Sequence, residues 1–441
     1  MAEAPLKMRK VLIVSPRFPP TNAADLHRVR VSLAYYREFG WDPTILCVEA
    51  KTSDCAEDAL LAQSLPADIS VVRVAAWDEA KCRRFGFGAL GYRSLLPLYV
   101  AGRRLLRQTR YDAVFFSTTV FTSFVLGRLW KRRFGCKIIF DFQDPWYSDT
   151  ILYSRDDAPG GWWKYRLDQM MARYLEAFAL RAADHVVTVS DGYVAALTRR
   201  YPWLERSKFT VLPFAASASD YDFAAEHGVQ QEIFTPDGEH VHWISAGRAG
   251  PDMVPILTVL FEAIAALSAR DPEFAARLRL DFVGTNYAPP KRTYKLVEPV
   301  AIRCGVTELV SEHSVRIPYF EAVSLYRISD AILLLGSVHS DYTLSKLFLC
   351  ILAKKPTLAL FHRRSMATQI ASQFPNIFVA TFDETPSEPQ FLNKVAAGIE
   401  WLRVPHFDPA AIDLRMEQWS AAALTRAQCA IFDQVSAAHP Q

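Results

Sequence analysis

The chain has 441 residues, of which 51% are apolar and 22% are charged, and its formal net charge is +3. This length exceeds what one hydrophobic core usually serves and the apolar content excludes a disordered protein, so we expect two globular domains of about 200 residues each. The seven Cys residues are scattered and form no C-x-x-C pair, which argues against a disulfide framework or a zinc site and is typical of a reducing, cytoplasmic location.

The chain begins with a short apolar run rather than a targeting segment. Residues 11–15 follow a basic start and are too few for the core of a signal peptide, so we interpret them as a buried strand. No stretch approaches ~18 uncharged apolar residues, and we therefore expect no membrane-spanning segment.

A first domain is expected over residues 1–225. Apolar runs alternate there with amphipathic stretches, a pattern typical of a parallel sheet that is covered by helices on both faces. The predicted strands are 11–15, 44–48, 70–74, 113–117, 137–141, 185–189 and 209–212, and the predicted helices are 25–39, 92–108, 121–134, 161–183 and 191–200.

A segment poor in aliphatic side chains, 214–228, then predicts a linker, with the domain boundary near residue 225. A second α/β domain is expected over 226–408, and the final segment, 409–441, should form a helix that packs back on the first domain. The predicted strands of the second domain are 241–245, 278–283, 309–312, 331–335, 357–361 and 377–380.

The two halves of the chain differ in charge. Residues 1–213 hold 31 Lys and Arg against 22 Asp and Glu, a balance of +9, and the remainder holds 19 against 25, a balance of −6. The basic half fits a peripheral contact with an anionic inner membrane face, or an anionic acceptor, but solvated helix faces explain the same charge. No recognisable nucleic-acid module accompanies it, so we expect no nucleic-acid binding. The basic clusters are Arg103, Arg104, Arg107 and Lys131, Arg132, Arg133.

Ligands of open α/β sheets bind beyond the carboxyl ends of the strands, so the residues that directly follow each strand matter most. Strand 241–245 runs into AGRAGPDM, in which Gly247 and Gly250 allow a close approach of the backbone to a ligand. Arg248 between them offers a fork of donors for a phosphate. A packing turn with a solvent-facing Arg is the alternative interpretation of this loop.

A second polar loop follows strand 331–335. Its sequence GSVHSDYTLSK gathers Asp341, Thr343, Ser345 and Lys346 at a junction between strand and helix. Hydroxyls, free amides and an ammonium group at such a junction would bind a diphosphate and its ribose. The alternative is that a hydroxyl merely caps the helix and the lysine is solvated.

The first domain contributes an acidic segment, DFQDPW at 141–146. Asp144 follows a central strand, where it would orient or deprotonate an acceptor hydroxyl, or stabilise positive charge on a sugar. A carboxylate that caps the next turn is the alternative. His27 and Arg28 begin the first helix and would contact phosphate or acceptor, unless they are simply solvated.

These segments resemble family 4 glycosyltransferases of the GT-B fold, which have two Rossmann-like doubly wound α/β domains facing a central cleft. The second domain offers GRAG at 247–250, FVG at 282–284, IPY at 317–319 and LSKLFLCILAKKPTLAL at 344–360. The first offers VLIVSPRFPPTNAADLHRVR at 11–30 and the DFQDPW segment. The motifs occur in the family's order and cover nearly the whole chain.

The resemblance implies a retaining glycosyltransferase that uses a nucleotide diphosphate sugar as co-substrate and needs no metal or other cofactor. It implies a sugar or lipid-linked acceptor, in surface polysaccharide or glycoconjugate biosynthesis, with the first-strand loop at Asn22 and Ala23 contacting substrate. The donor-binding residues that it implies are Gly247, Arg248, Gly250, Gly284, Ile317, Ser337, Asp341, Thr343, Ser345 and Lys346.

Three departures from the family pattern keep other functions open. Residues 22–25 replace the usual Gly pair, residues 251–253 stand where a Lys is usual, and the two carboxylates of the donor helix become Asp341 and Leu349. These departures make a non-catalytic nucleotide-sugar-binding protein one alternative, and a GT-B nucleotide-sugar epimerase, which binds the same donor but needs no acceptor, is the other. An NAD-dependent dehydrogenase is disfavoured, because neither first-strand loop contains G-x-G-x-x-G.

Overall fold

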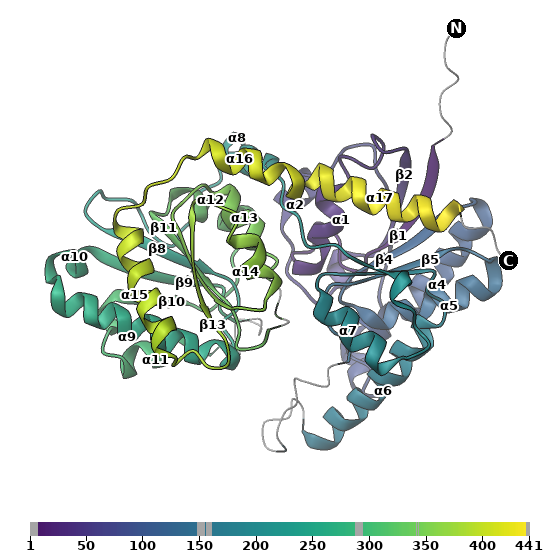
Figure 1. Ribbon diagram of the computed structural model, residues 1–441. Coiled ribbons are helices and arrows are strands. Elements are labelled where there is room, and N and C mark those ends of the chain that lie inside the picture. The colour runs from purple at the N-terminus through teal and green to yellow at the C-terminus, as the bar shows by residue number, and fades with distance from the viewer. Residues whose placement is uncertain are drawn as a thin grey trace, which may run out of the picture. The chain divides into compact units, whose positions relative to one another are not determined.

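The computed structural model describes residues 8–147, 155, 161–286, 294–340, 342 and 344–437, so the predicted donor residues Asp341 and Thr343 lie outside the described part. The chain forms two compact units. Unit 1 comprises Met1–Phe214 and Ala421–Gln441, and unit 2 comprises Ala215–Ser420. Each unit is a parallel sheet flanked by helices (Figure 1).

Unit 1 has a seven-stranded parallel sheet in the order β3-β2-β1-β4-β5-β6-β7. Its strands lie where the apolar runs predicted them, because strands covered on both faces need nearly continuous apolar sequence. The strands are β1 (Arg9–Val14), β2 (Trp41–Val48), β3 (Ser70–Val74), β4 (Ala113–Ser117), β5 (Ile138–Phe142), β6 (His185–Thr188) and β7 (Phe209–Val211). The helices are α1 (His27–Ser32), α2 (Ala59–Gln63), α3 (Glu79–Arg83), α4 (Leu90–Gln108), α5 (Val125–Phe134), α6 (Trp162–Leu180), α7 (Asp191–Arg200) and α17 (Ala421–Ala437).

Unit 2 has a six-stranded parallel sheet in the order β10-β9-β8-β11-β12-β13. Its strands also lie at the predicted positions, and they are β8 (Val241–Ala246), β9 (Leu278–Val283), β10 (Val310–His313), β11 (Ala331–Leu335), β12 (Thr357–His362) and β13 (Ile377–Phe382). The helices are α8 (Ser219–Glu226), α9 (Val254–Arg270), α10 (Pro272–Arg277), α11 (Val297–Arg303), α12 (Tyr319–Ile328), α13 (Leu347–Leu352), α14 (Met366–Ala371), α15 (Pro389–Arg403) and α16 (Ala410–Met416).

The segment predicted as a linker contains helix α8. Buried Asp220 on this helix accepts a hydrogen bond from the Tyr319 hydroxyl of α12 at 2.7 Å, and the ring of Phe223 packs on that of Phe320. These contacts bind α8 to unit 2, so the division between the units precedes the boundary near residue 225 that the sequence suggested.

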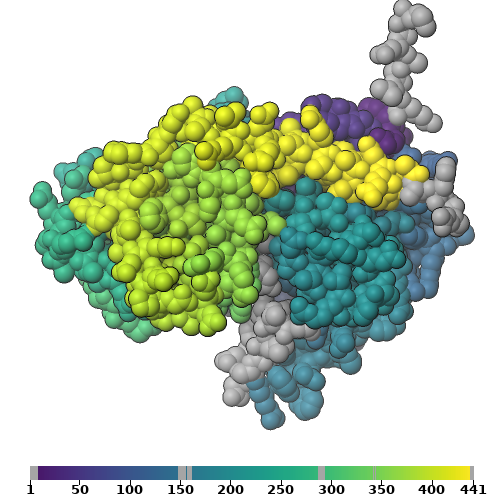
Figure 2. Space-filling view, viewed as in Figure 1, coloured from purple at the N-terminus to yellow at the C-terminus, as the bar shows by residue number. Residues whose placement is uncertain are grey.

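The C-terminal segment consists of two helices, with a break at Ser420, instead of one. α16 belongs to unit 2, whereas α17 belongs to unit 1 and packs against α1 and β4. In unit 1 the indole N–H of Trp41 donates to Asp433 at 2.8 Å, and the Trp41 ring meets the Phe432 ring edge-on. Other residues of the C-terminal helices, yellow in Figure 2, lie on the visible surface of their units, whereas Phe432 is fully buried.

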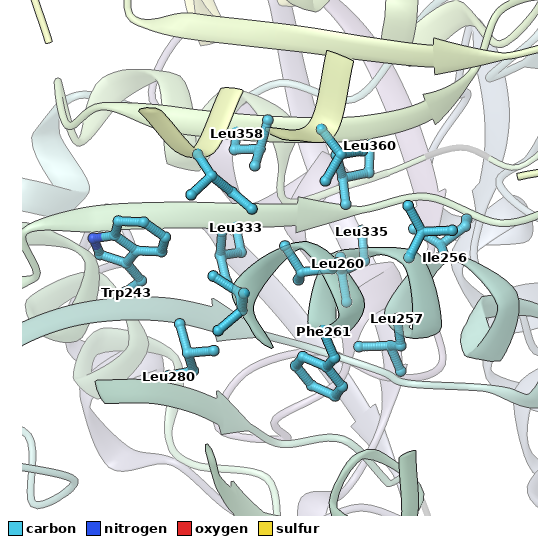
Figure 3. Close-up of a cluster of buried hydrophobic side chains, with 14 of the residues drawn as sticks. Trp243, Ile256, Leu257, Leu260, Phe261, Leu280, Leu333, Leu335, Leu358 and Leu360 are labelled. Atoms are coloured by element: carbon cyan, nitrogen blue, oxygen red, sulfur yellow. The ribbon is translucent and has the colours of Figure 1, made fainter. Parts of the chain in front are cut away.

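Helix α9 is the most apolar long helix of unit 2. Within the described residues, Pro251–Arg270 is the stretch whose length and composition would let it cross a membrane, which the sequence analysis did not anticipate. Ile256, Leu260 and Phe261 of this stretch are fully buried and pack in one cluster with strand residues such as Leu333 (Figure 3). Coverage of the sheet therefore explains its apolar character.

Candidate functional site

The loop after β8 and the lysine before α13 lie together in unit 2. The Lys346 ammonium donates a hydrogen bond to the carbonyl oxygen of Ala246 at 2.6 Å. Gly247 follows with a φ of 128°, and a Cβ atom there would come within 2.9 Å of Lys346 Nζ. Glycine is needed at 247 for the backbone conformation and for the space that the ammonium occupies. The structure thus brings two predicted donor residues into contact.

Lys346 has no carboxylate counter-ion among the residues that the structure describes. Burial of its ammonium group lowers the pKa of Lys346 below the ordinary value of 10.5. Among the described residues, Cys350 acts on the Lys346 charge, and burial raises the pKa of that thiol to about 12, so the thiol stays neutral. Among the described residues no carboxylate forms an ion pair with Lys346. The carbonyl of Ala246, which also accepts from the Tyr326 hydroxyl at 2.9 Å, is neutral and does not balance the ammonium charge.

Arg248 lies in the same loop but has an internal carboxylate partner. Its guanidinium contacts Asp252, with Nη2–Oδ1 at 2.5 Å and Nη1–Oδ2 at 3.3 Å. Burial alone would raise the pKa of Asp252, but hydrogen bonds from Arg248 and Ser337 outweigh burial and lower it. A Cβ atom at Gly250 would overlap both groups of the pair, so glycine makes room for it. The role of Asp252 was not predicted from the sequence, although a carboxylate four residues after an Arg is the signal for such a pair.

The other described donor candidates line the same edge of the unit 2 sheet. Gly284 follows β9 with a φ of 67°, and its N–H donates to the His313 carbonyl at 2.7 Å. Ser337 follows β11, is buried and contacts Asp252. Ile317 is half-buried before α12, and Ser345 is exposed before α13.

Leu349 does not face a binding surface. The residue is 7% exposed, and its carbonyl accepts a hydrogen bond from the Tyr221 hydroxyl of α8 at 2.8 Å. Its side chain belongs to the packing of α13, so no group at this position takes the place of the family's second carboxylate.

Arg28 is buried, and its guanidinium contacts other residues of unit 1. Its Nε atom lies 2.8 Å from Asp141 Oδ2, and its other nitrogens donate to the carbonyls of Leu212 and Pro213 at 2.8 and 3.1 Å. The guanidinium also lies 5.2 Å from the ring centroid of Phe214. The sequence placed Arg28 against substrate, whereas these contacts tie α1 to β5 and to the segment after β7.

Asp141 is the other half of this arrangement. Strand β5 carries it into the interior, where Ser117 donates to its Oδ2 atom at 2.7 Å and Gln143 donates at 3.2 Å. Complete burial raises the pKa of the Asp141 carboxyl, against the opposing effect of Arg28. Sequence analysis did not single out this ion pair; the signal was an acidic residue inside an otherwise apolar strand, which requires a buried partner.

Asp144 stands in an anchored loop after β5. The residue is exposed. Two residues on, the Trp146 ring stacks on Phe121, with centroids 5.8 Å apart. The backbone N–H of Tyr147 donates to Glu176 Oε2 on α6 at 3.2 Å. The loop is therefore held by α6 and by the segment before α5, while its carboxylate reaches the surface.

The first-strand loop presents little side chain to solvent. Ala23 is 3% exposed, and Asn22 is half-buried with its N–H bonded to the Ala56 carbonyl at 2.8 Å. Asp25 is buried and accepts from the backbone N–H of Thr119 at 2.9 Å, so it joins this loop to the one after β4. His27 is half-buried at the start of α1.

Comparisons with known proteins agree with this architecture. Residues 27–215 match the family model of the glycosyl transferase 4-like domain. No curated protein sequence matches the chain.

Solved structures extend the comparison over the whole chain. Anabaena HepE in complex with UDP and glucose has a TM-score of 0.62 at 15% identity and covers 97% of this chain and 100% of that one. A glycosyltransferase from Rickettsia africae has 0.59 at 14%, covering 98% and 100%. The α,α-trehalose 6-phosphate synthase from Burkholderia multivorans has 0.62 at 11%, covering 98% and 99%. At such identities the likeness shows the fold, and it is the fold predicted from the sequence.

Proposed function

We propose that this chain, which has the GT-B fold and contains a glycosyl transferase 4-like domain, transfers a sugar from a nucleotide diphosphate donor to an acceptor hydroxyl. The observation that carries the donor assignment is Lys346, a half-buried lysine with no carboxylate partner among the described residues. Such a group is stabilised by an anion, and the edge of a parallel α/β sheet is where a diphosphate binds.

The proposal assigns charge neutralisation of the diphosphate to protein cations rather than to a metal ion. Lys346 supplies an ammonium group beside the glycine loop, and Arg248 adds a guanidinium that it shares with Asp252. We further propose retention at the anomeric carbon. In that reaction the leaving phosphate oxygen takes the proton of the acceptor hydroxyl, so no protein nucleophile is required.

Donor binding is tested first. The HepE structure holds UDP and glucose, which makes UDP sugars the first to try. In a thermal-shift screen, a ligand that binds only the folded state at 100 times its Kd stabilises by ~2.7 kcal/mol. If no nucleoside diphosphate or nucleotide sugar stabilises the protein, the donor assignment fails.

Product analysis then separates the candidate reactions. Transfer to an added acceptor supports the proposal. Conversion of the donor to its epimer without any acceptor indicates an epimerase, and donor binding without transfer or hydrolysis indicates a binding protein.

We assign Asp144 to the acceptor side, where it would orient the hydroxyl or stabilise charge on the sugar. Asp144→Asn should then reduce turnover by on the order of 100-fold while donor affinity stays near that of the wild type. Wild-type turnover in this variant would reduce Asp144 to a capping residue.

We also propose that the acceptor is a sugar or a lipid-linked molecule of polysaccharide or glycoconjugate assembly, and that the enzyme uses it at the cytoplasmic face of a membrane. The basic surface that supports it is smaller than the sequence suggested. Arg104 and Arg107 are exposed, but Lys131 pairs with Asp184 at 2.7 Å and is neutralised within unit 1.

A further inference from the structure

Helix α6 carries an uncovered apolar stripe. Its buried face includes Tyr165 and Glu176, which are 8% and 1% exposed. The opposite face consists of residues spaced by four, three and four positions, which places them on one line along the helix. These are Trp163, Leu167, Met170 and Tyr174, which are 79%, 53%, 61% and 67% exposed.

The four side chains of this stripe are each more than half exposed and form a continuous apolar line. Single exposed apolar residues are common, but contiguous large ones mark interaction surfaces. Figure 1 shows the first turns of α6 extending away from the sheet of unit 1, and Figure 2 shows them on the outside of that unit.

Cations flank the stripe. Lys164, Arg166 and Arg173 are exposed on α6, against one exposed acid on this helix, Asp168. The neighbouring helix α5 adds a further basic group, because the Arg128 guanidinium lies 4.4 Å from the ring centroid of Phe178 on α6.

The basic groups and the stripe form one surface. Partial burial lowers the pKa of Arg128, and the nearby charges of Arg132 and Arg181 lower it further. Tyr174, the last residue of the stripe, lies close enough to act on the same guanidinium. An apolar line bordered by cations is the pattern of a helix that lies in the interface of an anionic bilayer.

We propose that α6 is a membrane-docking helix whose apolar stripe enters the boundary between headgroups and acyl chains while the surrounding cations bind lipid phosphates. A second copy of the chain is the weaker fit to the same spacing, since a symmetric contact between two such helices would bring their cationic borders together.

Docking through α6 would bring the acceptor-side loop near the bilayer. Glu176, on the buried face of α6, pairs with Arg200 at 2.6 Å and accepts from the N–H of Tyr147, three residues after Asp144. A helix fixed at the membrane would therefore also fix the loop of Asp144 relative to it. This role for the Asp144 loop rests on the proposed function, because it assumes a lipid-linked acceptor. The docking of α6 to a membrane does not depend on that function.

Vesicle co-sedimentation of the full chain tests the docking. Wild-type protein should bind phosphatidylcholine vesicles that contain phosphatidylglycerol and bind pure phosphatidylcholine vesicles far more weakly. Trp163→Ser with Leu167→Ser should lower the partition coefficient at least ~10-fold. Arg166→Glu with Arg173→Glu should lower it similarly and weaken its salt dependence.

Val404→Ser with Leu414→Ser is the matched control, since these apolar residues of unit 2 are 65% and 75% exposed. The control should bind vesicles like the wild type. All variants change exposed side chains, so unchanged thermal melting checks the fold. Wild-type vesicle binding by the stripe variant would overturn the proposal. The proposal would also be overturned if the wild type failed to bind vesicles and formed, in sedimentation velocity, a dimer that the Trp163→Ser, Leu167→Ser variant does not form. UDP affinity, measured separately, reports on the proposed function alone.

Discussion

Two cations stand near the ends of central strands, one in each unit, and their partners differ. Arg28 of unit 1 is paired with Asp141 and has two backbone carbonyls as further acceptors. Lys346 of unit 2 has a carbonyl acceptor and no carboxylate among the described residues. The first cation is neutralised within the fold, whereas the second has no neutralising carboxylate in the described part of the chain, and under the proposed function the donor diphosphate supplies that charge. The contrast suggests that the counter-ion, rather than the residue type or its place after a strand, distinguishes a structural cation from a ligand-binding one.

Arg28→Met is expected to have the largest effect. It removes the cation and leaves the Asp141 carboxyl buried, and breaking a buried ion pair from one side costs about 3–5 kcal/mol. Urea denaturation should show this loss in the free energy of unfolding, and Arg28→Met with Asp141→Leu should recover much of it. A single variant as stable as the wild type would mean that the pair is not structural.

Lys346→Met should give the opposite pattern. Charge-assisted hydrogen bonds contribute roughly 1.5 to 3 kcal/mol each, so affinity for UDP should fall at least ~10-fold in calorimetry. The free energy of unfolding should stay the same or rise, because an ammonium without a counter-ion is costly to bury. Lys394→Met makes the same change at an exposed position of α15 and should alter neither quantity. Unchanged UDP affinity in Lys346→Met would place the donor elsewhere.

The pH dependence sharpens the same contrast. Burial lowers the pKa of Lys346 below 10.5, so between that lowered pKa and 10.5 the unfolded chain binds a proton that the folded chain lacks. The Lys346 contribution to the free energy of unfolding should therefore rise with pH across this window. UDP affinity should fall across it, because a diphosphate favours the ammonium form. Thermal melting gives the pH dependence of stability and calorimetry gives the pH dependence of UDP affinity, and each is compared between the wild type and Lys346→Met. Equal pH dependences in the two proteins would exclude Lys346 as their source.

The sequence predicted the sheets well because strands of a parallel sheet are apolar along their length. The strand from Ile138 to Phe142 could be placed from its composition. Its one acidic residue, Asp141, could not be given a partner in the same way, because a hydrogen-bonded partner is set by how distant strands and helices meet. Arg28 was consequently assigned to substrate when the structure places it against Asp141.

In the donor loop, too, the position of the loop was predicted from the sequence, whereas the contacts of its side chains were not. The motif around Gly247 located the carboxyl end of β8, and Lys346, which the sequence assigned to the same donor site, lies beside that loop. The sequence did not reveal that Arg248 and Asp252 share one fork or that the Leu349 side chain is buried. The spacing of four residues between Arg248 and Asp252 was a usable signal, because such residues meet in the turn before α9. The burial of Leu349 was not predictable in this way, because the face of α13 that turns toward the core is set only by packing.

Asp252→Asn should have the smallest effect. It tests whether Arg248 is a structural cation like Arg28 or a ligand-binding cation like Lys346. Arg248 has a carboxylate partner, like Arg28, but its side chain is 34% exposed and that of Asp252 is 16% exposed, so the pair is open to exchange. Partly exposed pairs contribute about 0.2–1 kcal/mol, so neutralising Asp252 should raise UDP affinity by at most about 5-fold.

The amide can still contact Ser337, which keeps the loop in place, and Arg248→Met serves as the control that removes the fork itself. An increase measured by calorimetry would show that Asp252 competes with the diphosphate for Arg248. A decrease would instead mean that Asp252 holds the guanidinium in the orientation that binds phosphate, and the pair would then belong to the donor site as a unit.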